Sequence, residues 1–200
     1  ALGTHYLAQK DARTAAIIGS GWQAGAQLMG LLAVRPEIDT VRVFSPNPVN
    51  VVSFCEQARE QFSQEFCAAG SVAEAAKGVD IVLCATSSID SVFEAEYFEP
   101  GMHVGSIKPA EISRDSLEMA DRVCVHLGHG KPALVQADNL VVPDHSGGRG
   151  WEISDAFDFS SCVTLPDLIS GSVSGRGNND ERTCFVNDLG LGLQFAVVAG

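Results

Sequence analysis

The sequence predicts an α/β fold, namely a doubly wound, mostly parallel sheet with helices on both faces and a C-terminal helical extension. Short, apolar, β-favouring runs alternate with segments of helical periodicity along the first 126 residues. The run at 79–85 is apolar almost throughout, as expected of a parallel strand that helices cover on both faces. A glycine-rich turn at 19–24 joins the first strand to the first helix.

The expected elements alternate between strand and helix. We expect strands at 14–18, 41–44, 66–69, 79–85, 102–107 and 122–126. We expect helices at 23–34, 51–66, 71–77, 113–120 and 164–170. Pro46 and Pro48 end the second strand, because proline cannot donate to the ladder. The last apolar segment, 183–199, has helix-like spacing that Gly190 and Gly192 interrupt.

The charge and composition argue against several classes of partner. The 200 residues carry a formal net charge of −12 and no cluster of Lys and Arg, so we expect no nucleic-acid partner. The sequence shows neither a long apolar run nor a secretory leader, so we expect no membrane partner and a soluble, cytoplasmic protein.

The cysteines and histidines do not predict a metal centre. The six cysteines are scattered without a Cys-x-x-Cys pair, which favours buried, reduced thiols over a disulfide framework. His126 and His129 have a spacing that suits a metal, but their loop offers no third ligand. We therefore expect no metal site.

The glycine turn is the strongest local signal for a ligand. It consists of Gly19, Ser20, Gly21, Trp22, Gln23 and Ala24. Between a strand and a helix, such a turn brings backbone N–H groups and the positive end of the helix to a pyrophosphate. Gly19 permits the tight turn, Gly21 lets the phosphate approach, and Ala24 allows close helix packing. The pattern indicates a Rossmann-type NAD(P) site, and the alternative is a turn without a ligand.

The end of the second strand bears on the choice between NAD and NADP. It lacks the Asp or Glu that would hold the ribose hydroxyls of NAD, and Phe44 to Asn47 stand there instead. Ser45 and Asn47 can donate hydrogen bonds to a 2′-phosphate, so the sequence slightly favours NADP, although no arginine stands beside them. The alternative is that both residues only form the turn.

Two further loops end at the same edge of the predicted sheet. Thr86 and Ser87 follow the central strand, and Ile107 and Lys108 follow the next one, where open α/β sheets bind ligands. We expect Thr86, Ser87 and Ile107 to contact the cofactor and Lys108 to act as a catalytic cation near the substrate. The alternatives are a capped turn after the central strand and an isolated surface lysine.

Four segments together resemble the ornithine cyclodeaminase/mu-crystallin family: 19–28, 79–88, 100–104 and 175–195. The resemblance implies NAD(P)-dependent oxidoreduction at the Cα–N centre of a small amino or imino acid, in a homodimer. It also assigns the glycine turn to the pyrophosphate, Ser45 and Asn47 to the adenosine end, and Thr86 and Ser87 to the central dinucleotide. Asn187 and Gly190 would close over the nicotinamide.

The resemblance also implies a domain organisation. Residues 1–12 would end a linking helix, 13–150 would form the NAD(P)-binding domain, and 151–200 would be a helical extension that returns to the substrate domain. Family members carry an N-terminal segment with the substrate-binding arginine and lysine and the oligomer interface. Because Ala1 stands just ahead of the glycine turn, we expect this substrate half to be absent from the chain.

One difference from the family pattern makes some of the possible activities more plausible than others. Cyclodeaminases carry an aspartate in the loop after the fifth strand, where this chain has 105–111. Glu111 matches a glutamate typical of the family but does not take over the role of that aspartate. The leading hypothesis is therefore an imine or ketimine reductase or an amino-acid dehydrogenase. The alternatives are a non-catalytic, crystallin-like protein that binds NADPH and, third, an ornithine cyclodeaminase.

Overall fold

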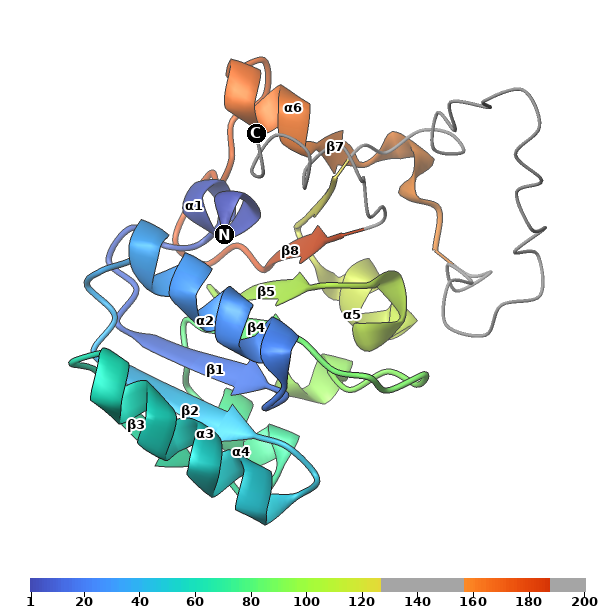
Figure 1. The fold of residues 1–200 in the computed structure, drawn as a ribbon. Coiled ribbons are helices and arrows are strands. Elements are labelled where there is room, and N and C mark those ends of the chain that lie inside the picture. Colours follow the sequence, from blue (N-terminus) through green and yellow to red (C-terminus); the bar gives the residue numbers. More distant parts are fainter. Residues whose placement is uncertain (127–156, 188–200) are drawn as a thin grey trace, which may run out of the picture.

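The computed structural model describes residues 1–126 and 157–187, and its centre is one parallel sheet (Figure 1). The strands are β1 Thr14–Ile18, β2 Thr40–Phe44, β3 Glu65–Ala68, β4 Ile81–Cys84, β5 His103–Ser106, β6 Arg122–Val125, β7 Val163–Thr164 and β8 Thr183–Val186. Their order is β3-β2-β1-β4-β5-β8-β6-β7, and each neighbouring pair is parallel. The predicted α/β fold with a parallel sheet is confirmed.

Helices cover both faces of the sheet. The α-helices are α1 Leu2–Leu7, α2 Trp22–Val34, α3 Pro48–Gln61, α4 Val72–Ala76, α5 Arg114–Met119 and α6 Leu165–Ser170. The 3-10 helices of the described residues are η1 Ala95–Tyr97, η2 Pro109–Glu111 and η3 Phe159–Ser161. In Figure 1, α2 and α3 lie on the same face. Ile17 of β1 packs in the apolar cluster on their side, and its neighbour Ile18 packs in the cluster on the side of α4 and α5. Side chains of a strand alternate between faces, so both faces need cover.

Local sequence explains where the helices begin. The side chains of Ser71 and Ser113 accept backbone N–H bonds in the first turns of α4 and α5, which confirms the predicted cap at Ser71. Helix α3 begins at Pro48, earlier than predicted. Proline suits a first helical position, because its φ is already fixed and its missing N–H leaves no donor unpaired there.

The C-terminal part corrects one expectation. The segment from Thr183 was expected to be helical, but Thr183–Val186 is strand β8, which lies between β5 and β6. All four residues are β-branched, aromatic or thiol-bearing and are largely buried, so they suit the interior of a sheet better than a helix surface. The sheet therefore continues into the stretch that was predicted as a helical extension, where α6 Leu165–Ser170 is the predicted short helix.

Helix α1 is held against the sheet by two arginines from distant parts of the chain. Arg35 Nη2 donates to His5 O at 2.7 Å, and Arg176 Nε donates to Leu7 O at 2.8 Å. Thr183 Oγ1 of β8 also donates to Leu7 O, at 3.0 Å. These bonds satisfy carbonyl groups at the end of α1 that have no partner within the helix.

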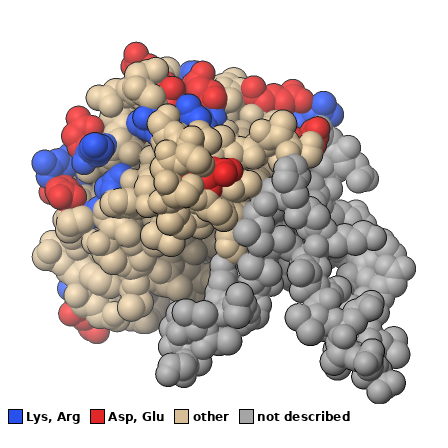
Figure 2. Space-filling model, turned by 90° about the horizontal axis from the view of Figure 1, so that it is seen from above, with Lys and Arg blue, Asp and Glu red and all other residues tan. Residues whose placement is uncertain are grey.

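Further observations concern the thiols, the surface charge and the length of the helices. The side chains of Cys55, Cys84 and Cys184 are buried, as predicted. In Figure 2, Lys and Arg side chains are interspersed with Asp and Glu on the face that is shown. None of the helices in the described residues is both long enough and apolar enough to cross a membrane.

Candidate functional site

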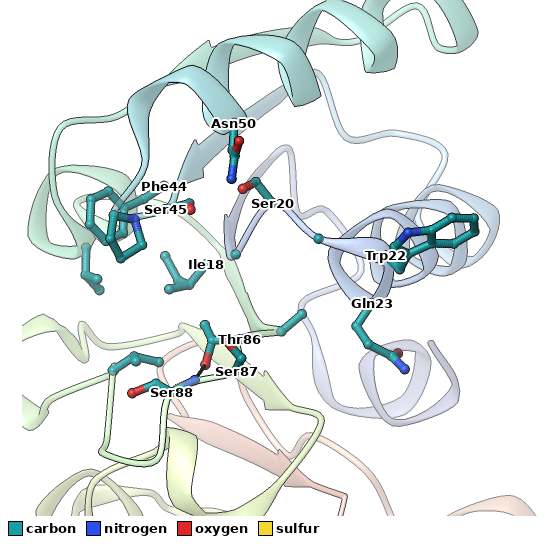
Figure 3. A pocket seen from close by; sticks show the side chains of 16 residues that line it. Ile18, Ser20, Trp22, Gln23, Phe44, Ser45, Asn50, Thr86, Ser87 and Ser88 are labelled. Atoms are coloured by element: carbon teal, nitrogen blue, oxygen red, sulfur yellow. Dashed lines mark hydrogen bonds between the residues drawn. The ribbon is translucent and has the colours of Figure 1, made fainter.

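A cavity of about 660 Å³ opens at the carboxyl edge of the sheet, between β1 and β4. The strand order reverses at this point, since β2 and β3 lie on one side and β5 on the other. Such a crevice is where open α/β sheets bind ligands. The turn after β1, the end of β2 with the start of α3, and the loop after β4 surround it (Figure 3). Its polar lining residues are Ser20, Gln23, Ser45, Asn50, Thr86, Ser87 and Ser88.

The glycine turn leaves the N-terminus of α2 uncapped. Gly19 has a φ of +123°, and a Cβ there would lie 2.2 Å from Ala85 O, so only glycine fits between β1 and the loop after β4. A Cβ on Gly21 would meet no atom within 4 Å. Helix α2 has neither an acidic residue in its first turn nor a side-chain cap. Its first N–H groups are therefore available to an anion, and the turn fits a pyrophosphate.

The far end of the cavity is formed by β2 and α3. Ser45 lines it, and Asn50 extends from the first turn of α3 towards Ser20 (Figure 3). Asn47 instead caps α3, since its Oδ1 accepts from Val49 N at 3.0 Å. Of the two interpretations of Asn47, a contact with the 2′-phosphate or a structural role in the turn, this bond fits the structural role. Among the described residues that line the cavity there is no Asp or Glu.

Sequence reasoning missed Asn50, although its position carried a signal. Helices that follow the strands of a parallel sheet begin at the carboxyl edge, so the first turn of each helix borders the ligand crevice. Asn50 lies in the first turn of α3, three residues past the cap Asn47. Its amide offers both donors and an acceptor to a ligand.

A buried carboxylate connects the loops after β4 and β5. Glu111, in η2, is fully buried. Its Oε1 accepts from Thr86 N at 2.6 Å and from Thr86 Oγ1 at 2.8 Å, and its Oε2 accepts from Ile107 N at 3.0 Å. Burial raises the pKa of Glu111 above its ordinary value, against the opposing effect of these bonds and of nearby Lys108.

The predicted catalytic cation contacts a residue that lines the cavity. Lys108 Nζ donates to the carbonyl of Ser88, which lines the cavity, whereas Lys108 itself is not part of the lining. Asn187 donates from Nδ2 to Ile107 O at 3.3 Å and from its backbone N to Ser106 O at 3.2 Å. Ile107 and Asn187 are thus fixed beside the cavity, at the ends of β5 and β8, without lining it.

The structure brings most of the predicted cofactor residues together. The cavity is lined by Gly19, Ser20, Gly21, Trp22, Gln23, Ser45, Thr86 and Ser87. Ala24 is fully buried beneath the turn, in the packing position that was expected of it. The Trp22 side chain is 97% exposed. Gly190 and His129 lie outside the described residues, within which no group of three or more possible metal ligands occurs.

Comparison with known proteins identifies the family. The model of the ornithine cyclodeaminase/mu-crystallin family matches residues 1–199. The chain belongs to this family.

Several relatives are reductases or dehydrogenases by name. The chain is 29% identical over 204 residues to a Δ1-pyrroline-2-carboxylate reductase of Bacillus cereus, covering 99% of this chain and 59% of the relative. It is 27% identical to an alanine dehydrogenase of Archaeoglobus fulgidus, covering 99% and 58%. The solved structure of a Thermococcus litoralis Δ1-pyrroline-2-carboxylate reductase, in complex with NADH and L-proline, superposes with a TM-score of 0.80 at 27% identity, covering 99% and 59%. The chain thus spans less than two thirds of the length of these relatives.

Proposed function

We propose that this chain is the cofactor-binding part of an NAD(P)H-dependent oxidoreductase that acts at the Cα–N centre of amino or imino acids. The observation that carries the proposal is the cavity where the strand order reverses, with the uncapped end of α2 open to it. Membership of the family supports the choice of chemistry, because its similar relatives include pyrroline-2-carboxylate reductases and an alanine dehydrogenase. An imine reductase or an amino-acid dehydrogenase is the activity we favour.

Each wall of the cavity has a proposed task. When bound, the nicotinamide supplies the hydride. The glycine turn and the start of α2 hold the pyrophosphate, and Thr86 and Ser87 hold the middle of the dinucleotide. Lys108, tied to Ser88 O, places a positive charge beside the substrate and provides a proton for the imine nitrogen. Asn187 and Gly190 are proposed to close the nicotinamide side.

The choice between NADPH and NADH is testable at Ser45. We lean towards NADPH because no carboxylate lines the cavity among the described residues, and because Ser45 and Asn50 are available to a 2′-phosphate. The Thermococcus litoralis relative was solved with NADH, so both cofactors must be compared. We expect Ser45→Asp to weaken NADPH binding about tenfold or more and NADH binding much less. Calorimetric titration of the wild type and the variant with each cofactor measures this.

Turnover assays test the reaction itself. The protein is assayed for oxidation of NADPH or NADH with Δ1-pyrroline-2-carboxylate and with pyruvate plus ammonia, and for release of ammonia from ornithine. Reduction of either of the first two substrates is the expected result, with Lys108→Met lowering kcat and Lys108→Arg restoring part of it. Cofactor binding without turnover would favour the crystallin-like alternative, and ammonia release from ornithine would favour a cyclodeaminase.

Two further proposals follow from the family and the composition. We propose that the whole protein is a homodimer, which light scattering on the purified protein tests. We also propose a cytoplasmic location, which the scattered cysteines without a Cys-x-x-Cys pair favour. Imaging of the tagged protein in its own cells checks the compartment.

A further inference from the structure

Glu111 receives hydrogen bonds that favour its ionised carboxylate. Thr86 N donates to Oε1 and Ile107 N donates to Oε2, so each oxygen faces a backbone donor that can do nothing but donate. A protonated carboxyl or a glutamine would set a hydrogen on one of these oxygens or replace it with an amide nitrogen. The carboxylate is therefore the side chain that satisfies both donors at once.

The same residue holds both ends of the loop after β4. Its side chain binds Thr86 at the start of the loop, and its backbone O accepts from Val92 N and Phe93 N, each at 3.0 Å, at the end. Thr86, Ser88 and Val92 line the cavity. Between these anchors, Ser88 N donates to Thr86 Oγ1 at 3.2 Å (Figure 3).

Glu111 thus connects three segments that end at the cavity. Its bond to Ile107 N fixes the loop after β5, whose next residue Lys108 donates to Ser88 O across the gap. Ile107 O in turn accepts from Asn187 at the end of β8. The titratable groups that face the carboxylate are Lys108 of the β5 loop and the Cys84 thiol of β4.

We propose that Glu111 is a positioning residue, whose ionised carboxylate fixes the loop after β4 to the loop after β5 and so holds the cavity wall in the shape that receives the dinucleotide. Glu111 itself is fully buried and does not line the cavity, so it acts on the site through Thr86, which does. This proposal rests on the proposed function, because it names the residue that prepares that site.

Substitution by glutamine tests the proposal with little change in volume. In Glu111→Gln one backbone N–H loses its acceptor, and we expect the dissociation constant for NADPH to rise about tenfold, the effect of roughly one hydrogen bond to a charged group. Glu118→Gln is the matched control, since Glu118 is exposed on α5 and pairs only with Arg114 in the described structure. The dissociation constant of Glu118→Gln for NADPH is expected to stay within about twofold of the wild-type value.

A second measurement does not depend on the cofactor, and its wild-type part does not depend on the variant folding. In the wild type, the amide protons of Thr86 and Ile107 are expected to shift together in NMR spectra as one group titrates in acid, and that shift is absent from Glu111→Gln. If these amides do not respond jointly, or if Glu111→Gln binds NADPH like Glu118→Gln, the proposal is overturned. If the wild type binds neither NADPH nor NADH, the proposed function fails, and the amide titration still decides whether Glu111 holds the two loops.

Discussion

Gly19 and Gly21 stand two residues apart in the glycine turn but are constrained by different neighbours. At Gly19 the constraint is the protein itself, because a Cβ would meet Ala85 O in a backbone conformation that favours glycine. At Gly21 the space is open within the protein and belongs to the cavity. Substitution at the two positions should therefore separate stability from binding.

We expect Gly19→Ala to cost about 1–3 kcal/mol of stability as well as cofactor affinity. Gly21→Ala should leave the free energy of unfolding nearly unchanged and weaken NADPH binding about tenfold or more, because the added methyl group occupies the place of the phosphate. Urea unfolding and calorimetric titration measure the two effects. Gly25→Ala, at another open position of α2, is the control and should bind normally. Normal binding by Gly21→Ala would contradict a pyrophosphate at the turn.

His103 makes the stability of the protein depend on pH. Thr183 Oγ1 gives its one proton to Leu7 O, so His103 Nδ1 must donate to Thr183, at 3.0 Å. His103 Nε2 is buried without a hydrogen-bond partner in the described structure. Burial, followed by the positive charges of Arg176, the N-terminus and Arg35, lowers the pKa of His103 from 6.5 to about 3.

The sign of this effect follows from the protons bound in each state. Between pH 6.5 and about 3 the unfolded chain binds a proton at His103 that the folded protein does not. Stability should therefore fall on acidification through this window, by at most about 1.4 kcal/mol per pH unit from this residue. Urea midpoints from pH 7 to 4 should fall less steeply in His103→Asn, which keeps a donor for Thr183. Equal slopes would show that another group is responsible.

Among the elements, α3 depends on a cap that sequence reasoning assigned to the ligand. Because Asn47 Oδ1 accepts from Val49 N, we expect Asn47→Ala to destabilise the protein by about 1 kcal/mol. NADPH affinity should change less than in Ser45→Ala, since Ser45 lines the cavity and Asn47 does not. Thermal unfolding and titration of both variants check this. A larger loss of affinity in Asn47→Ala would restore the predicted contact with the adenosine end.

The strands and helices of residues 14–126 were predictable because each has a local signature. Periodicity identifies the strands, and Pro48 and Ser71 mark where helices begin. Strand β8 returns to the middle of the sheet, and its neighbours β5 and β6 come from much earlier in the sequence. Its pairing is a non-local event that no local pattern encodes.

The candidate site also has a part that could be predicted from local sequence and a part that could not. The glycine turn could be predicted as a phosphate-binding candidate, because the groups that would bind the ligand belong to consecutive residues. The role of Glu111 could not be predicted, since its donors come from residues 25 and 4 positions away and converge only in the folded chain. The cap at Asn47 and the cavity contact of Asn50 were similarly indistinguishable until α3 was placed.

For the whole molecule, Arg176 joins the first and last described parts of the chain. It donates to Leu7 O, to Glu181 O at 2.7 Å and to Thr183 Oγ1 at 3.2 Å. Lysine keeps the charge but lacks the planar guanidinium group that donates to several acceptors at once. We therefore expect Arg176→Lys to lower the free energy of unfolding by about 2–4 kcal/mol. Arg114→Lys, at an exposed pair, should change it by less than about 0.5 kcal/mol. Urea denaturation compares the two variants, and equal stabilities would contradict the role of Arg176.

The place of β8 also sets the order in which the protein can be made. Strands β5 and β6 leave the ribosome early and β5 can pair with β4, but β6 cannot join the sheet until Thr183–Val186 has been synthesised and inserted between them. During that interval their edges are exposed to mispairing and aggregation. Nascent chains halted before β8 should therefore remain sensitive to protease over β6, and chains released after it should become resistant. Helix α1, which contacts β8 through Leu7, would be made well before β8 and be among the last segments to be secured.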